Sequence, residues 1–502
     1  MKKDLRWYDH FALNAYWLGQ SFVSGVMTPI LTPWLVLFFA PEAQKNTYLS
    51  IVSVIGLAVA MLVQPLAGYL SDHSTSKWGR RRPYIFLGAV LNSIFVILMA
   101  ISPVFGSMKA GSPNVLFGVT LGFIVLIIAT IFSQFVANIA QGALNGLIPD
   151  LVPEHQRGFS SGTKSVFELL PSLLILAAGI GSLVDKGMGL LVGLIMAGGL
   201  LVTMAITVIA AKEQPSESKN EKNFGETFWR ILALTVIFVG VTELVTYLLN
   251  QGGHIVANLA VVPQVLIIGL LGLAGTAGAI FIGVYYGARV GIGKDAKTQS
   301  SFIWWVINRL LFLAAIGAIQ GFAYYFLQDV VKVQNVGFMT TLLMGVVALF
   351  LLPSALIGGR LADKMGKKRL VSIAGIIATV GAFLLVGTGF LANTGFLSLP
   401  QGVIIAMVMV SGCVIGTGTG TFMATNWALG TDLVPPEQAG KYLGISNLAG
   451  AGAGIVGRGI GGPMADFFNG LVPGLGYLVI FTIYAVLFLL SVVVLVKVKT
   501  KD

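Results

Sequence analysis

Charged residues are scarce in this chain of 502 residues. Asp, Glu, Lys and Arg together make up 10% of the sequence, whereas a soluble domain carries about 25%. A folded chain of this length would have too little polar surface to remain in water. The scarcity excludes a soluble enzyme, a nucleic-acid-binding protein and a disordered scaffold as descriptions of the whole chain.

Cysteine and histidine are scarce as well. The single cysteine, Cys413, excludes an internal disulfide framework. The four histidines, His10, His73, His155 and His254, are scattered without the spacing of metal ligands. We therefore expect no metal site and no other cofactor. The sequence also shows no pairing of a nucleophile with a base, so we expect that the protein is not an enzyme.

Long apolar runs are abundant, because 56% of the residues are hydrophobic. The runs are unbroken and reach the length of about 20 residues that a membrane-spanning helix needs. They lack the alternation typical of a membrane β-barrel. The sequence therefore predicts an all-α polytopic membrane protein. Hydropathy places fourteen spans, at 11–40, 48–70, 84–103, 115–148, 159–184, 188–211, 228–249, 258–288, 301–328, 337–359, 370–392, 400–429, 441–466 and 474–496.

Basic residues follow this pattern of spans. With the N-terminus inside, four of the 31 Lys and Arg residues fall in outer loops and two fall within spans, which leaves 25 on the inner side. The positive-inside rule then predicts fourteen spans with both termini cytoplasmic, in the cell (inner or plasma) membrane. The same distribution accounts for the net charge of +11 without a nucleic-acid partner. The six exceptions are Lys45, Lys109, Lys186 and Lys332 outside, and Arg309 and Arg458 within spans.

Two sequence motifs each occur twice. PDLVPEHQRG at 149–158 reappears as TDLVPPEQAG at 431–440, and LSDHSTSKWGRRR at 70–82 reappears as LADKMGKKR at 361–369. Two motif pairs in the same order indicate a duplicated six-helix half. We expect an N-terminal half at 1–211, a loop with two inserted membrane helices at 212–300, and a C-terminal half at 301–502.

A parallel duplication of six-helix halves is the layout of the major facilitator superfamily. The chain resembles that superfamily in GYLSDHSTSKWGRRRP and GGRLADKMGKKR, its motif between the second and third helix of each half. Residues 64–89 resemble the sucrose–proton and glycoside–cation symporters, whereas the two extra spans resemble fourteen-span drug–proton antiporters. The resemblance implies a major facilitator fold and a secondary transporter of a sugar or glycoside that works by alternating access. Drug or organic-anion efflux by proton antiport, and a non-transporting receptor or assembly factor, remain alternatives.

The resemblance also implies that the acidic residues of these motifs hold a cytoplasmic gate closed. A carboxylate is stabilised by a neighbouring arginine and by a helix N-terminus. The simpler alternative is that the charges only set topology. The candidate gate residues are Asp72 with Arg80 and Arg81, Asp363 with Lys367, Asp150 with Arg157, and Asp432.

Polar side chains within the spans are the candidates for substrate binding. Gln134, Asn138, Gln141 and Asn145 share one face of the fourth span. Amides offer donors and acceptors to sugar hydroxyls, although they also join helices to one another. The full set of candidates is Gln20, Ser24, Gln134, Asn138, Gln141, Asn308, Gln320 and Tyr324.

Glu168 is the candidate for proton coupling. It lies about nine residues into the fifth span, or about 14 Å along a helix, where an ionisable group is functional by default. The alternative is a local i,i+4 ion pair with Lys164. Arg309 and Arg458 are intramembrane cations that could balance Glu168 or bind an anion. The expected partners are a small-molecule substrate, protons and the lipid bilayer, and we expect a monomer.

Overall fold

The computed structural model describes residues 4–72, 74–108, 115–116, 118–213, 224–292, 299–434 and 439–499. The chain divides into two compact units. Unit 1 contains Met1–Ala40 and Ile55–Leu232, and unit 2 contains Pro41–Val54 and Ala233–Asp502. Helix α3 (Lys45–Asp72) therefore begins in unit 2 and ends in unit 1.

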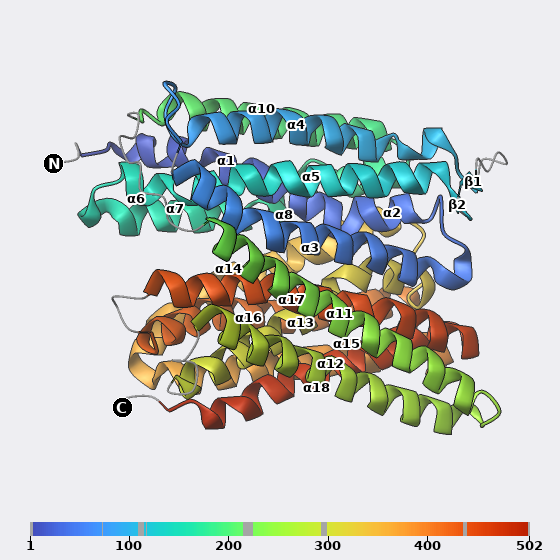
Figure 1. Ribbon diagram of the computed structural model, residues 1–502. Coiled ribbons are helices and arrows are strands. Elements are labelled where there is room, and N and C mark those ends of the chain that lie inside the picture. Colours follow the sequence, from blue (N-terminus) through green and yellow to red (C-terminus); the bar gives the residue numbers. More distant parts are fainter. Residues whose placement is uncertain are drawn as a thin grey trace. The chain divides into compact units, whose positions relative to one another are not determined.

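Unit 1 is built of helices apart from one short hairpin. Helix α4 contacts both α5 and α10 (Figure 1). The strands β1 (Val115–Leu116) and β2 (Val119–Thr120) pair antiparallel before α5 begins. Besides most of α3, the helices are α1 (Trp7–Val26), α2 (Thr32–Val36), α4 (Arg82–Ala100), α5 (Leu121–Asn145), α6 (Leu147–Leu151), α7 (Arg157–Leu169), α8 (Pro171–Ala177), α9 (Ile180–Asp185) and α10 (Gly189–Ala210).

Unit 2 contains the long helices of the C-terminal part of the chain. Helix α16 packs against α14 and α15, and α13 packs against α17 and α18. The helices are α11 (Phe224–Val256, of which the first residues belong to unit 1), α12 (Val261–Ile292), α13 (Ser300–Asp329), α14 (Val336–Met365), α15 (Lys367–Thr394), α16 (Gln401–Asp432), α17 (Ala439–Leu471) and α18 (Leu475–Val494). Short helical turns lie at Met27–Leu31, Glu42–Gln44, Ser102–Phe105, Glu154–Gln156 and Leu495–Lys497.

Prolines interrupt two of the predicted spans. Pro29 lies in the π-helical turn between α1 and α2, and Pro33 lies in the first turn of α2. Pro171 begins α8 directly after α7. Proline has no backbone N–H to donate to the preceding turn and crowds the carbonyl of that turn, so a continuous helix bends or breaks there. The predicted spans 11–40 and 159–184 are therefore each a series of shorter helices.

Eleven helices in the described part of the chain are long and apolar enough to cross a membrane. The predicted all-α membrane protein is confirmed by this count and by the helical architecture, the two-stranded hairpin aside. The predicted span 115–148 begins later than expected, because the hairpin occupies residues up to Thr120 and α5 starts at Leu121. The segments 11–40, 159–184 and 441–466 are not among the eleven.

Glycines let helix backbones approach closely in both units. A Cβ at Gly142 of α5 would lie 2.7 Å from the carbonyl oxygen of Gln64 of α3. In unit 2, a Cβ at Gly416 of α16 would lie 2.6 Å from the carbonyl oxygen of Val347 of α14. No side chain fits at such a distance. These positions fix how far each helix slides along its neighbour, and so where the side chains at the helix ends meet.

The two inserted helices pack on α17. Phe238 of α11 lies against Gly452, and Phe467 lies against Gly253 of α11. Met464 of α17 lies against Gly272 of α12. The faces of α11 and α12 that do not pack carry exposed leucine, valine and isoleucine side chains, as expected for helices in contact with lipid.

Candidate functional site

Arg81 is the centre of a charged cluster at the end of unit 1 where α3 meets α4. Its guanidinium forms ion pairs with Asp72 and with Asp150, the latter at 2.9 Å from Nε. It also donates a hydrogen bond to Ser71 Oγ at 2.6 Å. The Arg81 side chain is buried. A buried cation with two carboxylate partners joins the ends of α3, α4 and α6.

The other predicted pairs of this cluster need correction. Arg80 forms its ion pair with Asp150 rather than with Asp72. Arg157 donates to the carbonyl oxygen of Pro149 at 3.3 Å and lies 3.7 Å from Glu154, and it does not pair with Asp150. Because two arginines reach Asp150 from the start of α4, this carboxylate is already occupied.

Glu213 belongs to the same cluster and was missed by the sequence analysis. Its Oε2 accepts hydrogen bonds from the backbone N–H groups of Arg81 at 2.8 Å and Arg82 at 3.1 Å, at the start of α4. A carboxylate at this position stabilises the positive end of the helix. The only sequence signal for it is an acid just after the sixth predicted span.

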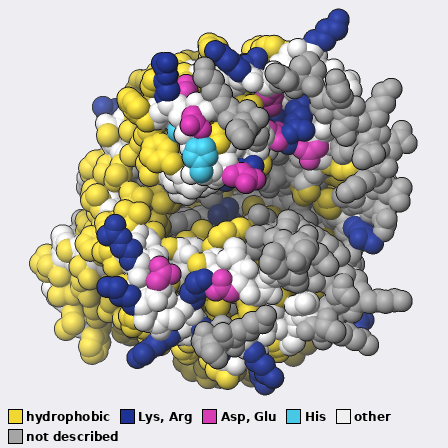
Figure 2. Space-filling model, turned by 90° about the vertical axis from the view of Figure 1, so that its left-hand side faces the viewer, with side chains coloured by type: hydrophobic (Ala, Val, Ile, Leu, Met, Phe, Trp, Pro, Cys, Tyr) yellow, Lys and Arg dark blue, Asp and Glu magenta, His cyan; other side chains and the backbone are white. Residues whose placement is uncertain are grey.

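The second motif copy forms a smaller cluster in unit 2. Lys367 forms an ion pair with Asp432 at 2.6 Å, and not with Asp363 as predicted. The Asp363 side chain is exposed and forms no ion pair within the described residues. Figure 2 shows Lys, Arg, Asp and Glu side chains gathered on the end face turned to the viewer, with hydrophobic side chains along its left-hand margin.

The amides of α5 bond mainly along their own helix. Asn138 Nδ2 donates to the Gln134 carbonyl oxygen at 2.8 Å and to Gln134 Oε1 at 3.3 Å. Gln134 faces α3, where its Cγ would lie 3.4 Å from a Cβ at Gly56. Gln141 is half-buried. These amides face protein, as predicted for polar groups in a span, and Gln134 keeps donor groups for a further partner.

Helix α1, which carries two of the candidates, packs against α7. Ser24 is exposed and donates to the carbonyl oxygen of Gln20, whose own Oε1 is buried without a hydrogen-bond partner in the described structure. Lys164 of α7 places its Nζ 4.0 Å from the ring centre of Trp17 and 3.6 Å from Glu168 Oε1. Glu168 is 38% exposed. The i,i+4 pair is therefore present, and protein does not enclose the carboxylate on every side.

Three side chains of unit 2 form a buried polar chain near the start of α13. Asn308 Nδ2 donates to the carbonyl oxygen of Ser491, and Asn308 Oδ1 accepts from Asn426 Nδ2 at 2.6 Å. Asn426 Oδ1 in turn accepts from the guanidinium of Arg309 at 3.3 Å. Asn426 was not singled out from the sequence, because one amide in a helix rich in glycine and threonine carries no pattern. Asn308 holds α13 to α16 and α18.

Arg309 lies near two indole rings. Its guanidinium carbon is 4.9 Å from the ring centre of Trp427 and 5.9 Å from that of Trp305. Arg309 is 8% exposed, and its Nε has no hydrogen-bond partner in the described residues. Of the other candidates on α13, Gln320 is exposed and Tyr324 is buried.

Arg458 is the second cation within unit 2, near the middle of α17. Its Nε donates to the carbonyl oxygen of Gly317 of α13 at 3.1 Å. A Cβ at Gly321 would lie 3.2 Å from the same nitrogen, so the glycines of α13 make room for the guanidinium. In the described part of the chain, neither Arg309 nor Arg458 lies within ion-pair distance of a carboxylate.

A second network lies at the opposite end of α13, in the part of unit 2 that includes the start of α3. Lys45 is 3% exposed and forms ion pairs with Asp329 at 2.7 Å and with Glu42. Tyr477 of α18 donates its hydroxyl to Asp329 Oδ2 at 2.5 Å. In the sequence, Lys45 falls in a predicted outer loop, and no motif marks Asp329.

Asp466 of α17 caps the N-terminus of α3. Its carboxylate accepts hydrogen bonds from the Thr47 backbone N–H at 2.7 Å and the Thr47 hydroxyl at 2.6 Å. It also accepts from the Asn46 backbone N–H at 3.2 Å and from Asn46 Nδ2 at 2.8 Å. An acid from another helix thus satisfies donors that the first turn of α3 leaves unpaired. We call Lys45, Asn46, Asp329, Asp466 and Tyr477 the far-end network.

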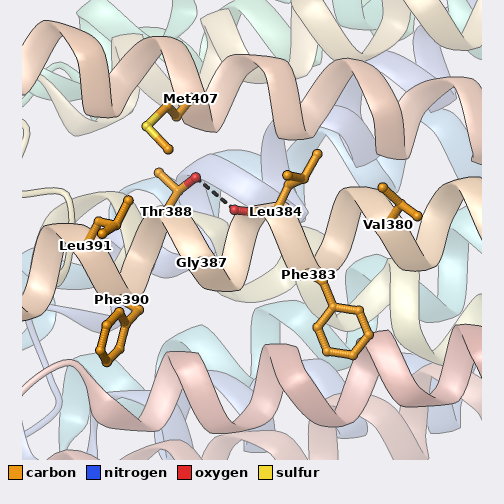
Figure 3. A pocket seen from close by; sticks show the side chains of 8 residues that line it. All are labelled: Val380, Phe383, Leu384, Gly387, Thr388, Phe390, Leu391 and Met407. Atoms are coloured by element: carbon orange, nitrogen blue, oxygen red, sulfur yellow. Dashed lines mark hydrogen bonds between the residues drawn. The ribbon is translucent and has the colours of Figure 1, made fainter.

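A surface pocket of about 540 Å³ lies between α15 and α16. Figure 3 shows its lining, which is apolar except for Thr388, and the Thr388 hydroxyl donates to the carbonyl oxygen of Leu384 at 2.8 Å. The pocket offers no free polar group to a hydroxylated ligand. It is an apolar groove of the kind that lipid chains fill.

Two family profiles match the chain, one over its first part and one over its second part. The family profile described as "MFS/sugar transport protein" matches residues 20–285. The profile described as "Major Facilitator Superfamily" matches residues 292–458 and 339–502. These matches confirm the resemblance that the loop motifs indicated.

Curated relatives match a part of the chain. The sucrose transport protein SUC4 of Arabidopsis thaliana is 32% identical over 168 residues, 32% of this chain and 31% of the relative. The sucrose transport protein SUT1 of Oryza sativa subsp. japonica is 31% identical over 144 residues, 28% of this chain and 26% of the relative. The chain spans about a third of the length of the curated relatives that it matches.

Solved structures are similar over almost the whole chain. A POT family transporter in complex with 5-aminolevulinic acid has a TM-score of 0.66 at 17% identity, covering 98% of this chain and 96% of the other. A D-xylose-proton symporter has a TM-score of 0.60 at 16% identity, covering 98% and 97%. At this level of identity the likeness shows the shared fold alone.

Proposed function

Because the chain belongs to the MFS/sugar transport family of the major facilitator superfamily, we propose that it moves a sugar or glycoside across a membrane by alternating access. The match of the sugar-transport profile to residues 20–285 carries this proposal. The curated relatives, which are named as sucrose transport proteins, support the same substrate class. Half-buried amides such as Gln134 are groups that could bind sugar hydroxyls.

We propose fourteen spans in two six-helix halves, at 1–211 and 301–502, with the inserted pair between them. Three segments would add to the eleven apolar helices: α1 with α2, α7 with α8 and α9, and α17. The distribution of Lys and Arg supports a cytoplasmic position for both termini in the cell membrane. The protein would act as a monomer.

Single-cysteine labelling tests this topology. Gly79 and Gly366 have positive φ angles, so the neighbouring exposed residues Trp78 and Met365 are better sites for a thiol. In a background without Cys413, we expect an impermeant reagent to label both positions from the cytoplasmic side only. Labelling of the two positions from opposite sides would contradict the fourteen-span arrangement.

The cluster around Arg81 and the far-end network are candidates for the two gates. With the termini inside, the Arg81 cluster lies on the cytoplasmic side. Lys499 N donates to Ser301 Oγ, so Lys499 lies at the start of α13 and Asp329 lies at the opposite end of that helix. The far-end network would then be the outer gate. It would have to open whenever the first turn of α3 separates from α17.

Asp150 and Asp72 differ in their surroundings, which predicts different effects on transport. Asp150 is 16% exposed and binds two arginines, whereas Asp72 is 50% exposed and binds one. We expect Asp150→Asn to lower the rate of substrate exchange in proteoliposomes about tenfold or more, and Asp72→Asn to lower it severalfold. A charge pair is worth more when its groups are shielded from water. Equal, wild-type rates in both variants would leave these acids with a topological role only.

A substrate screen tests the proposed function itself. Proteoliposomes containing the purified protein would be offered labelled mono- and disaccharides, glycosides and lipophilic cations and anions, with and without a pH gradient. We expect uptake of one class of labelled sugar. This uptake should be absent from vesicles without protein, and an excess of the unlabelled sugar should abolish it. Transport of lipophilic compounds alone would favour the drug-efflux alternative. No transport of any compound by folded protein would favour the receptor alternative.

We propose Glu168 as the proton-coupling residue and Arg309 as a cation that assists it. The support is that Glu168 lies in the proposed span 159–184, is 38% exposed and pairs with Lys164. Arg309 carries an unpaired Nε within the membrane region. Exchange of a proton at Glu168 would change the charge of the Lys164 pair, which is the kind of change that biases a two-state transporter.

A further inference from the structure

We propose that Arg458 is a substrate-binding residue that recognises an anionic group, so that the transported sugar carries a carboxylate. This inference rests on the proposed function and narrows its substrate class. It starts from a cation near the middle of α17 whose one hydrogen-bond partner in the described structure is a backbone carbonyl. The remaining guanidinium N–H groups are free to bind a ligand.

The charge at Arg458 has no counter-charge near it. The carboxylates that α13 and α17 themselves carry are engaged elsewhere: Asp466 binds the first turn of α3, and Asp329 binds Lys45 and Tyr477. A charge within the membrane region is costly unless an opposite charge or several strong hydrogen bonds compensate it. The partial charge of one carbonyl does not neutralise a guanidinium. An anionic ligand can therefore supply the negative charge that the protein does not place beside Arg458.

The guanidinium is held against α13, and the backbone of α17 that carries it is held as well. Gly317 binds its Nε, and Gly321 leaves the space that it occupies on α13. The backbone of α17 is fixed at the same level, because Ser50 donates to the Arg458 carbonyl oxygen at 2.7 Å and Tyr484 donates to that of Gly457 at 2.8 Å. A cation held in a fixed orientation binds a planar carboxylate with two hydrogen bonds at little entropic cost.

Arg309 adds to the positive potential of this part of unit 2. It lies eight residues before Gly317 on α13, or about 12 Å along the helix axis, and it too has no carboxylate partner in the described residues. Two unneutralised cations, one on α13 and one that packs against α13 from α17, raise the positive potential there and attract anions. Lys164, by contrast, is already paired with Glu168 and adds no net charge.

The position of Arg458 fits a binding role better than a structural one. Substrate sites of this type of transporter lie near the middle of the membrane, and Arg458 and Gly317 are both near the middle of their helices. An arginine that only joined α17 to α13 would need no charge there, because glycine-to-helix packing already joins these helices at Gly457 and Ala314. A carboxylate fits the planar guanidinium better than a hydroxyl does.

Matched pairs of ligands test the proposal on the purified full-length protein. Binding of glucose and glucuronate, and of galactose and galacturonate, would be measured by titration calorimetry and thermal stabilisation at constant ionic strength. We expect the acidic member of at least one pair to bind with a Kd at least tenfold lower. Arg458→Gln should abolish that preference, and Arg458→Lys should keep a part of it because the charge remains. Arg289→Gln, an exposed arginine on α12, is the matched control and should keep the full preference.

The outcomes separate this inference from the proposed function. If the neutral sugars bind as tightly as their acids, or if folded Arg458→Gln keeps the preference, the inference is wrong and sugar transport stands. If acetate or sulfate binds as tightly as the acidic sugars, Arg458 is a simple anion site and the acidic-sugar assignment is wrong. If no sugar of either kind binds or is transported, both proposals fail together.

Discussion

Replacing Asp466 by alanine is expected to open the outer side of the transporter. The carboxylate accepts four hydrogen bonds from Asn46 and Thr47 at the first turn of α3. Loss of an N-cap costs about 0.5–2 kcal/mol, and hydrogen bonds to a charged group contribute about 1.5–3 kcal/mol. A change of about 2–3 kcal/mol in favour of the open state shifts a two-state equilibrium about 30- to 150-fold.

A thiol at Ser50 reports the opening. Ser50 is buried one turn below Asn46, and a Cβ on Gly462 of α17 would lie 1.9 Å from its hydroxyl oxygen. In a background without Cys413, we expect Asp466→Ala to raise the rate at which an impermeant reagent labels Ser50→Cys from outside by at least tenfold. Both proteins compared would carry Ser50→Cys, one with Asp466 and one with Asp466→Ala. Any effect of the cysteine itself is then the same in both.

Asn469→Ala is the matched control for this experiment. Asn469 lies on the same helix and accepts a hydrogen bond from the backbone N–H of Gly476, so it holds the turn between α17 and α18, and among the described residues it forms no hydrogen bond with α3. Its removal should leave the labelling of Ser50→Cys unchanged. If Asp466→Ala also leaves the rate unchanged, the acid is a local helix cap and the far-end network is not a gate.

The sequence predicted the membrane helices because their signal is local. Hydropathy averages over about 20 residues, and each copy of the loop motifs is one short continuous segment, so the family resemblance followed directly. The same averaging concealed the π-helical turn at Pro29 and the interruption before Pro171, although proline itself is a visible signal. The hairpin ahead of α5 was also averaged into a span.

The partners of the charged residues could not be predicted in the same way. Arg80 binds Asp150 because α4 packs closely against α5, where a Cβ at Gly88 would lie 2.7 Å from the carbonyl oxygen of Val136. A pattern of residues along one segment does not show how two helices are aligned with each other. Lys367 reaches Asp432 for the same kind of reason. An exposed motif acid such as Asp363 can be recognised without its partner being known.

The far-end network was missed for a different reason. Asp329 and Asp466 lie near the ends of helices, where a hydropathy profile treats acids as the start of a loop. Their function depends on residues in other parts of the chain, since Asp466 binds a helix that begins more than 400 residues earlier. Such a contact leaves a trace in an alignment of related sequences, but none in a single one.

The largest functional effect is expected from Glu168→Gln. Glu168 lies in the last turn of α7, directly before the break at Pro171, and pairs with Lys164 at 3.6 Å. If the carboxylate carries the proton, the amide mimics the permanently protonated form. The variant should bind substrate and exchange it across the membrane at close to the wild-type rate, because exchange requires no net movement of protons. Accumulation driven by a pH gradient should be lost.

Lys164→Met is the variant that separates coupling from pairing. Lys164 also stacks on Trp17 at 4.0 Å, and methionine keeps the apolar part of that contact while it removes the charge. If Glu168 serves only as the partner of Lys164, both variants should lower thermal stability slightly and leave gradient-driven accumulation intact. If Glu168 carries the proton, accumulation should disappear in Glu168→Gln and persist, at a shifted pH optimum, in Lys164→Met. Gradient-driven uptake in Glu168→Gln proteoliposomes would exclude Glu168 as the coupling residue and leave an uncoupled or anion-linked mechanism as the better description.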